Sequence, residues 1–414
     1  MSLKILVTKY LFLILLFIAI VLPCNAQKEN NIWYFGQGNG LDFNFIPPKV
    51  FTFNNVSNVN IIKGYSSVSD KNGRLLFYTD GRTVWNKNQA IMINGENLGK
   101  TPTPGQTSII VKQPAKPIYY LFYSDVYRFP NGASNPNNNY YYAIIDMTSG
   151  DGVVTVKNEI LAKNAGEKIA IVKSLSKCGY WVVTHARTGN SFYSFFLDSS
   201  GVNKQPIVSK VGLEYIFNGP NRSSNANIGY LKFSPNGDKL AAAHFPDHGL
   251  EIYDFDKNSG IVSNAIMIDK DKGRYYGFEF SPSGKYLYLG LNLTNDIYQF
   301  DMSLPANAIS SSEKVVIRNI KAGRIASLQL GPNGKIYVAL FSSEYMGVIN
   351  NPDAPVENVQ FNTYGVKLPN IHGTDGLPSF INENNFSFTS PLTLGNDTIV
   401  CDDKLVLNSN VKAF

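Results

Sequence analysis

Apolar and polar residues alternate along this chain in short paired runs, and a tight turn joins the two runs of each pair. A period of two is typical of β-strands with one buried face, and proline and glycine in the turns supply the backbone angles of a hairpin. The pattern therefore predicts β-hairpins. The three best-aligned copies are LKFSPNGDKLAAA (231–243), FEFSPSGKYLYLG (278–290) and LQLGPNGKIYVAL (328–340).

These hairpins belong to a repeating unit. The turn prolines Pro235, Pro282 and Pro332 follow one another at intervals of about 50 residues. A third alternating run follows each copy, and no segment shows the 3.6-residue period of an amphipathic helix. The third runs lie at 250–256, 296–302 and 346–352, and weaker copies of the unit at 67–86, 108–147 and 174–198 bring the total to six.

Units of four antiparallel strands with this period, arranged around an axis, are the blades of a β-propeller. We therefore expect an all-β fold, a β-propeller with seven four-stranded blades, with six or eight blades as alternatives; a two-sheet sandwich does not require such a repeat. The ends of the ring must be fastened, because an unpaired edge leaves ladder groups exposed. We expect the N-terminal strand in NIWYFGQGNGLDFN (31–44) to close the ring as the outer strand of a blade that contains GLPSFIN (376–382).

The first residues predict export. Lys4 and Lys9 precede an apolar run over 10–22, and the small residue Ala26 follows it, which is the pattern of a secretory signal. The run is shorter than the ~20 residues that span a bilayer. We therefore expect residues 1–26 to be a signal peptide, and the mature chain to be secreted or held at the exterior of the cell surface without a membrane span.

Composition excludes some classes of partner. The net charge is +6, but the basic residues are scattered, so we expect no binding to nucleic acid. With Cys24 in the signal, Cys178 and Cys401 do not make a disulfide framework, and we expect Cys178 to be a small packed side chain. Aromatic residues make up 13% of the chain and glycines number 34, which favours strands joined by many turns.

A set of motifs along the chain resembles a known family. They are NIWYFGQGNGLDFN, GRLLFYTDGRTVWNKNQAIM, GYLKFSPNGDKLAAA, YGFEFSPSGKYLYL, LQLGPNGKIYVA, MGVINNP and GLPSFI. Together they resemble the N-terminal β-propeller of large surface proteins of gliding Bacteroidetes, which end in a gliding-motility-associated or type IX secretion sorting domain. The resemblance covers about residues 31–388. The propeller is also similar in fold to YVTN-repeat and quinoprotein-amine-dehydrogenase-like domains.

The resemblance implies a domain organisation. Residues 27–390 correspond to the propeller. Residues 391–414, with LTLGNDTIVCDDKLVLNSN, resemble the start of a truncated immunoglobulin-like or PKD-like module, or a linker. The sorting domain of the family is missing from this sequence, so we expect either a fragment of a longer protein or a truncated relative. Attachment to the cell surface is what the family implies.

Polar residues at equivalent positions of the repeats mark a candidate site. In a propeller, the loops after the second strands and before the first strands share one face, at the mouth of the central channel. We expect a binding face there that contains Asp80, Arg82, His185, Arg187, His244, Arg274, His372 and Asp375.

Three of these residues raise the question of a metal. A site on His185, His244 and His372 would need all its ligands at ~2.0–2.2 Å from one ion, whereas equivalent positions of successive blades lie farther apart. We therefore expect no metal and no cofactor, and the alternative to a binding role is that each histidine caps loop backbone at the end of its own strand. The run DFDKNSG (254–260) lacks the glutamate and the glycine position of an EF-hand, and we expect a turn there.

No nucleophile elbow, Walker loop or His-Glu-x-x-His motif occurs in the sequence, so we assign no catalytic residue. The expected function is a non-enzymatic binding or scaffold module of a cell-surface protein, acting in adhesion or in interaction with polysaccharide or protein. The alternative is a propeller enzyme of the lactonase or quinoprotein-like class with its site at the channel mouth. A third possibility is a propeller that only spaces other domains.

Overall fold

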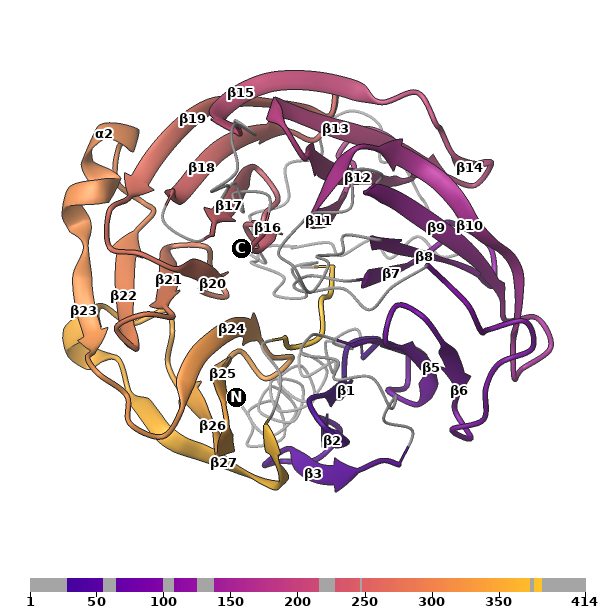
Figure 1. Ribbon diagram of the computed structural model, residues 1–414, viewed down its shortest axis with the longest axis horizontal. Coiled ribbons are helices and arrows are strands. Elements are labelled where there is room, and N and C mark those ends of the chain that lie inside the picture. Colours follow the sequence, from indigo (N-terminus) through magenta and orange to yellow (C-terminus); the bar gives the residue numbers. More distant parts are fainter. Residues whose placement is uncertain are drawn as a thin grey trace, which may run out of the picture.

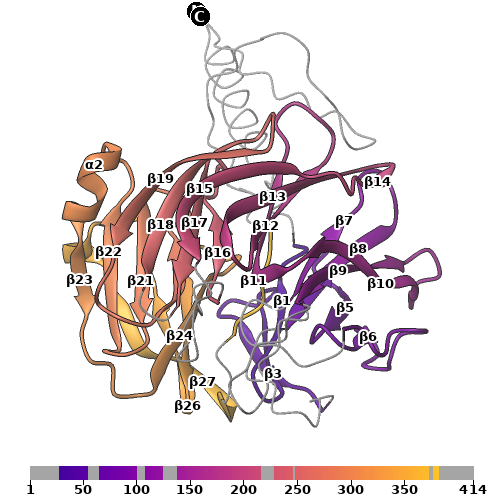
Figure 2. The ribbon, with the colours of Figure 1, turned by 45° about the horizontal axis from the view of Figure 1, so that its top comes forward.

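The computed structural model describes residues 28–54, 65–99, 108–124, 138–215, 228–245, 248–372 and 376–381. Its strands form seven antiparallel sheets, which are arranged as blades around a central axis (Figures 1 and 2). The predicted seven-bladed β-propeller is therefore confirmed. The predicted signal peptide (1–26) and C-terminal module (391–414) lie outside the described residues.

The first four blades follow one another along the chain, and within each blade the described strands pair in chain order, except that β15 of blade 4 pairs with β13. Blade 1 contains β1 (Ile32–Phe35), β2 (Asn39–Asp42) and β3 (Lys49–Thr52); blade 2 contains β4 (Ser66–Ser69), β5 (Leu75–Thr79) and β6 (Val84–Asn86). Blade 3 contains β7 (Ser108–Lys112), β8 (Ile118–Ser124), β9 (Asn139–Asp146) and β10 (Val153–Lys163). Blade 4 contains β11 (Ala165–Lys173), β12 (Tyr180–Ala186), β13 (Gly189–Asp198), β14 (Gly201–Val202) and β15 (Ile207–Tyr215).

The last three blades each have the four expected strands. Blade 5 contains β16 (Leu231–Phe233), β17 (Lys239–His244), β18 (Gly249–Asp256) and β19 (Ile261–Asp269). Blade 6 contains β20 (Tyr275–Phe280), β21 (Tyr286–Leu291), β22 (Asp296–Asp301) and β23 (Lys314–Ile317), and blade 7 contains β24 (Arg324–Leu330), β25 (Ile336–Phe341), β26 (Ser343–Ile349) and β27 (Phe361–His372). The described helices are short turns on the rim: α2 (Ala306–Ile309), η1 (Ser310–Ser312) and η2 (Val356–Asn358).

The repeated Pro-x-Gly sequences form the predicted hairpins between the first and second strands of blades 5, 6 and 7. In blade 5, Gly237 has φ +74°, a conformation that residues with a Cβ rarely adopt. The Ser234 hydroxyl accepts a hydrogen bond from the Lys239 backbone N–H at 3.0 Å across the same turn. The six units read from the sequence correspond to blades 2 to 7.

Blade 1 closes the ring in a different way from the one predicted. β1 pairs with β2 along Ile32–Phe35, within its own three-stranded sheet, so its expected role as the outer strand of another blade is wrong. Glu29, just before β1, accepts a hydrogen bond from the Ser69 backbone N–H at the end of β4. β1 therefore starts where the first strand of blade 2 ends, and it runs in the direction of a second strand.

The chain segment 376–381 packs against blade 1 without forming a strand. In this segment Leu377 is buried in the core cluster that contains Trp33, and the Phe380 ring lies 5.7 Å from the Trp33 ring. Figures 1 and 2 both show the segment, in yellow, at the centre of the ring. The two ends of the chain therefore do meet in one blade, but the N-terminal part supplies three strands and the C-terminal part lies at the axis.

Blade 7 and blade 1 are also joined on the outside. The Asn39 side chain donates to the Asn370 carbonyl at 3.1 Å and accepts from its backbone N–H at 3.1 Å. In the described part of the chain, blades 1 and 2 have three strands each and blade 4 has five. Cys178 is disulfide-bonded, so the expectation of a merely packed side chain is wrong.

Candidate functional site

The residues predicted to bind a ligand lie where strands end on one face of the disc. Asp80 follows β5, His185 is the second-last residue of β12, and His244 is the last residue of β17. The strands β5, β12 and β17 are the second strands of their blades, so their ends reach the same face of the disc. We call this face the strand-end face. Arg274 precedes β20 on this face, and His372 ends β27 there, paired with Ser343. Asp375 lies outside the described residues.

A chain of hydrogen-bonding groups connects blades 4 and 5 through His244. The Tyr215 hydroxyl lies 2.6 Å from His244 Nδ1, and His244 Nε2 lies 3.0 Å from a carboxylate oxygen of Glu251 on β18. Tyr253 donates to the same oxygen, as does the Leu213 backbone N–H at 3.0 Å. Burial raises the pKa of Glu251, but the bonds from these neighbours outweigh burial, so its pKa is lowered.

His185 packs beside this chain of groups without joining it. Its ring centroid is 4.4 Å from that of Tyr215 and 4.6 Å from that of Phe192, and its Nδ1 lies 2.6 Å from the Ala186 carbonyl oxygen. Burial lowers the pKa of His185 to about 3 and that of His244 to about 4. Both rings are therefore neutral at pH 7.

Lys168 brings an amine to the same place. The ladder between β11 and β12 shifts register, and such a bulge redirects the side chains within it, here Glu167 and Lys168. Lys168 Nζ donates to the Ile228 carbonyl at 2.9 Å and lies 5.4 Å from the centre of the Tyr215 ring. Burial lowers the pKa of Lys168 to about 7, although nearby carboxylates act in the opposite direction.

We call this group the interblade cluster; it comprises Lys168, His185, Tyr215, His244, Glu251 and Tyr253. A phenol, an imidazole and a carboxylate in line can relay a proton. A catalytic group must also contact its substrate, yet each residue of the interblade cluster is at most 5% exposed. The ionisable groups are therefore enclosed between two blades, where Tyr215, His244 and Glu251 contact one another and His185 and Lys168 bond to backbone carbonyls.

The metal hypothesis gains no support from this geometry. The described residues contain no group of three His, Cys, Asp or Glu side chains placed to hold an ion. In the run 254–260, Asp254 pairs with Lys239 at 2.5 Å, and Asp256 accepts a bond from the Asn258 backbone N–H at 2.9 Å. These bonds match the turn that we expected for this run.

Asp80 organises a turn on the strand-end face of blade 2. Its Oδ1 accepts hydrogen bonds from the backbone N–H groups of Arg82 and Thr83, both at 2.8 Å. Thr79 supports the same turn, because its hydroxyl donates to the Thr83 carbonyl at 2.7 Å and accepts from the Gly81 N–H at 2.9 Å. Burial raises the pKa of Asp80, while the two backbone bonds and the charge of Arg82 lower it, and the net shift is upward.

The other predicted arginines lie in different settings. Arg187 is buried, burial lowers its pKa, and its backbone N–H donates to the Asn164 carbonyl at 2.9 Å. Arg274 is exposed and has φ +56°. The structure thus brings His185 and His244 together around Tyr215 and keeps Asp80 and Arg82 in one turn of blade 2. Arg274 and His372 lie in other blades, and a binding role for all these residues stays a prediction.

Sequence reasoning missed a second polar cluster at the axis. Lys232, Glu279 and Gln329 occupy the same position of the three aligned hairpins, in LKF, FEF and LQL. Lys232 Nζ donates to the Glu279 carboxylate at 2.7 Å and to the Gln329 side-chain oxygen at 2.9 Å. Polar residues repeated inside an otherwise apolar first strand were the signal that could have revealed this cluster.

The axis itself is filled by the chain. A cavity of about 20 Å³ lies beside Lys232 and Gln329 and is bounded by Ser379 and Phe380 of the central segment. This volume suffices for one water molecule. Among the described residues, this cavity at the axis is too small for an organic substrate.

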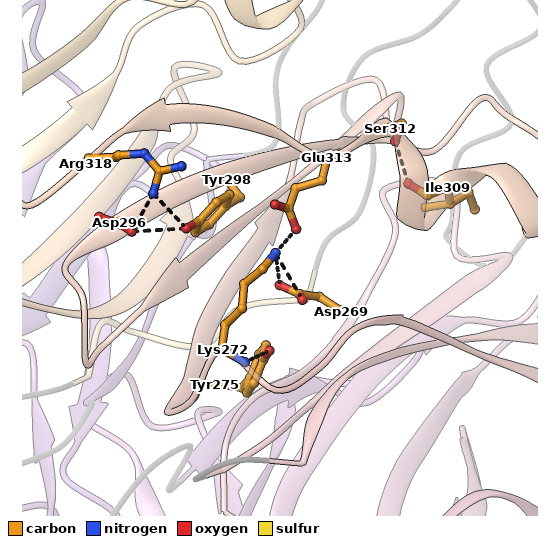
Figure 3. Close-up of polar contacts among 9 residues, drawn as sticks. All are labelled: Asp269, Lys272, Tyr275, Asp296, Tyr298, Ile309, Ser312, Glu313 and Arg318. Carbon is orange, nitrogen blue, oxygen red and sulfur yellow. Dashed lines mark hydrogen bonds and ion pairs between the residues drawn. The ribbon is translucent and has the colours of Figure 1, made fainter.

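A third polar cluster joins blades 5 and 6 on the rim (Figure 3). Lys272 forms ion pairs with Asp269, at 3.2 Å, and with Glu313, and its ammonium group lies 4.7 Å from the centre of the Tyr298 ring. On the other side of this ring Arg318 lies 3.4 Å from the Asp296 carboxylate. Each charge has a partner of opposite sign, which is typical of a contact that holds neighbouring blades together.

No helix in the described part of the chain combines the length and apolarity that a membrane span requires. No protein-family profile and no curated protein matches the sequence. Among solved structures, a putative 6-phosphogluconolactonase from Bacteroides fragilis is 10% identical, with 73% of this chain and 93% of that chain covered and a TM-score of 0.42.

Two other solved structures are similar to the same degree. The periplasmic gluconolactonase of Pseudomonas aeruginosa is 11% identical, covering 74% of this chain and 93% of that chain with a TM-score of 0.38. A β-propeller domain from Myceliophteria thermophila is 14% identical, covering 63% and 72% with a TM-score of 0.38. These sequence identities and TM-scores are too low to transfer an activity. The seven-bladed propeller is established by the strand topology of this chain itself.

Proposed function

We propose that this chain is an exported, non-enzymatic β-propeller that serves as a binding module of a cell-surface protein. One observation carries the proposal: the ionisable side chains that converge near the strand-end face are buried and packed against one another. An enzyme needs such groups open to substrate. Here His244 has the Tyr215 hydroxyl and the Glu251 carboxylate on its two nitrogens.

The closed ring supports the same function. The segment 376–381 fills the axis, and the blades are joined by the contacts of Asn39 with Asn370 and of Lys272 with Glu313. A rigid disc that carries many loops on one face is suited to binding, because ordering costs little when the scaffold is already fixed. The predicted signal in residues 1–26 motivates the cell-surface location, and polysaccharide or a surface protein is the partner class that this location supplies.

The enzymatic alternative makes a measurable prediction. The purified full chain is incubated with glucono-δ-lactone and with 6-phosphogluconolactone, and hydrolysis is followed by proton release beside buffer alone and beside His244→Gln. We expect all three to show the spontaneous rate. Hydrolysis above this rate that His244→Gln abolishes refutes the non-enzymatic proposal.

Binding and export need separate measurements. The labelled chain is applied to surfaces coated with purified polysaccharides, and saturable retention that unlabelled chain competes away is the expected result. N-terminal sequencing of the protein recovered outside the cytoplasm is expected to begin at Gln27. A chain that keeps residues 1–26 and stays in the cytoplasm contradicts the proposed location.

A further inference from the structure

An amine, a carboxylate and an amide meet at the axis, on the first strands of blades 5, 6 and 7. We call Lys232, Glu279 and Gln329 the axial triad. Lys232 Nζ lies 2.7 Å from Glu279 Oε2 and 2.9 Å from Gln329 Oε1. Because the C=O bond of an amide is about 1.2 Å long, this nitrogen lies within about 4.1 Å of the Gln329 carbonyl carbon, Cδ. That distance is near the ~3–3.5 Å at which an amine attacks a carbonyl carbon.

The axial triad is closed to solvent, and its surroundings are apolar. Lys232, Glu279 and Gln329 are 7%, 0% and 3% exposed, and each stands between two apolar residues of its strand, in LKF, FEF and LQL. Burial lowers the pKa of Lys232, although the Glu279 carboxylate acts in the opposite direction. The transfer of one proton from Lys232 to Glu279, which leaves a neutral amine and a neutral acid, therefore costs less free energy here than in water.

The carboxylate and the amide are both fixed beside the amine. Gln329 Nε2 donates to the Leu330 carbonyl at 3.3 Å, and Glu279 Oε2 accepts from the Leu330 backbone N–H at 2.9 Å. A cavity of about 20 Å³ is lined by Lys232 and Gln329, so one molecule of the size of water or ammonia has room at the amide. All the reacting groups belong to the chain, and a reaction among them needs no access from solvent.

We propose that the axial triad is a self-modification site, in which Lys232 Nζ forms an amide cross-link with Gln329 Cδ and Glu279 is the catalytic base and acid. Lys232 first passes a proton to the Glu279 carboxylate, and rotation about its Cε–Nζ bond turns the lone pair toward Cδ. The Nζ–Cδ bond then forms, and the bond from Cδ to the side-chain NH₂ group breaks. Glu279 gives its proton to the leaving nitrogen and takes another from Nζ.

The atoms and charges of this reaction balance. One amine and one primary amide become one secondary amide and one ammonia, and the proton that remains on Glu279 departs with the ammonia as ammonium. No electrons are transferred to or from another molecule, so the reaction requires no oxidant, reductant or co-reactant.

The ion pair of Lys232 and Glu279 is the starting state of this reaction. While Lys232 keeps all its protons it donates to Glu279, to Gln329 and to the Leu328 carbonyl at 2.7 Å, and its nitrogen has no lone pair for attack. Only the neutral pair reacts, so the link forms slowly after folding, and newly folded chain carries the ion pair. The link then joins blades 5 and 7 through residues that are 97 positions apart in the sequence.

The test is the intact mass of the purified full chain, measured directly after folding and again during incubation just below its melting temperature. We expect a growing fraction that is lighter by about 17 Da, because amide formation expels one ammonia. Tryptic digestion of this fraction is expected to give a branched peptide that joins Lys232 to Gln329, without cleavage after Lys232. On a denaturing gel the linked chain should migrate faster, because the cross-link keeps the unfolded chain more compact.

Two variants separate the roles of the amide and the carboxylate. Gln329→Met keeps the ion pair but removes the amide, and we expect it to retain the mass of its sequence throughout the incubation. Glu279→Gln keeps the amine and the Gln329 amide, and we expect the Lys232–Gln329 peptide to form at least about 100-fold more slowly, because the base is lost. The result for the wild-type chain stands by itself if a variant does not fold.

The chain also contains a matched control pair. Lys335 Nζ lies 2.8 Å from Asn350 Oδ1, so an amine and an amide meet there as they do in the axial triad. Both residues are partly exposed, and in the described part of the chain no carboxylate forms an ion pair with Lys335. We expect no Lys335–Asn350 link in the same incubation, because nothing there favours the neutral amine.

Three results overturn the proposal. One is a wild-type chain that keeps its full mass throughout the incubation. Another is a loss of ammonia that peptide mapping places elsewhere, such as a succinimide at Asn94, which precedes Gly95. The third is a Lys232–Gln329 peptide that forms as fast in Glu279→Gln as in the wild type, which refutes the role of the carboxylate.

Discussion

Glu279→Gln at the propeller axis tests whether the buried ion pair with Lys232 holds three blades together. The side chains of Lys232 and Glu279 are 7% and 0% exposed, and their charged atoms are 2.7 Å apart. Glu279 also accepts hydrogen bonds from the backbone N–H groups of Phe280 and Leu330, both at 2.9 Å. An amide in its place removes the negative charge and turns an NH₂ group toward one of these donors.

The cost follows from this geometry. Removing one partner of a buried ion pair leaves an uncompensated charge, which lowers the free energy of unfolding by about 3–5 kcal/mol. The same Lys232 ammonium retains only neutral acceptors, the Leu328 carbonyl and the Gln329 side-chain oxygen, at 2.7 and 2.9 Å. We therefore expect Glu279→Gln to lie within this range.

Urea unfolding followed by tryptophan fluorescence measures the loss, and a double-mutant cycle with Lys232→Met isolates the pair. Because the two side chains are in contact, we expect the double variant to lose at least about 1 kcal/mol less than the two single losses together. Glu357→Gln is the control: its pair with Lys314 spans 3.6 Å with both side chains more than half exposed, and such pairs contribute about 0–1 kcal/mol. A loss for Glu279→Gln no larger than that for Glu357→Gln, or strictly additive losses in the cycle, would refute the reasoning.

Three further predictions concern the interblade cluster, the closing segment and a turn. Burial lowers the pKa of His244 to about 4, so between pH 6.5 and 4 the unfolded chain binds a proton at this residue that the folded chain does not, which lowers the free energy of unfolding by about 3 kcal/mol as pH decreases. His185, whose pKa is lowered to about 3, adds a fall of its own, so His244→Gln should reduce the pH dependence in urea titrations without abolishing it. Leu377→Ala, at a position 1% exposed in the core with Trp33, should cost about 2–5 kcal/mol, and a loss below 1 kcal/mol in the same titrations would mean that the central segment does not fasten the ring. Gly260→Ala should lower the melting temperature measured by circular dichroism, because Gly260 has φ +77° and an added Cβ would lie 2.7 Å from the Trp181 ring; an unchanged melting temperature would contradict this.

The proposed function depends on whether reactive side chains are accessible to a substrate, and not only on whether the chain contains them. Sequence position predicted His185 and His244 as neighbours on one face, and in the structure they do lie around one tyrosine. Their burial, however, changes their role, because a neutral imidazole enclosed between blades cannot meet a substrate.

The sequence alone determined the blades. Strand alternation and Pro-x-Gly turns are local properties, because side chains of a strand alternate between its faces and each hairpin turn depends on the few residues within it. The repeat of these local units, about 50 residues apart, then requires a ring of sheets. The recurring Lys232, Glu279 and Gln329 were visible in this repeat as well, although their meeting at the axis was not.

The tertiary structure alone decided how the ring closes and which polar groups find partners. Whether β1 acts as an outer strand or as the second strand of its blade depends on which neighbour it packs against, and the alternating pattern of β1 is compatible with both. The bonds of His244 with Tyr215, and of Lys232 with Gln329, likewise depend on distances between segments far apart in sequence. A pattern with a period of two says which side of a strand is buried, but it does not say what lies across from that side.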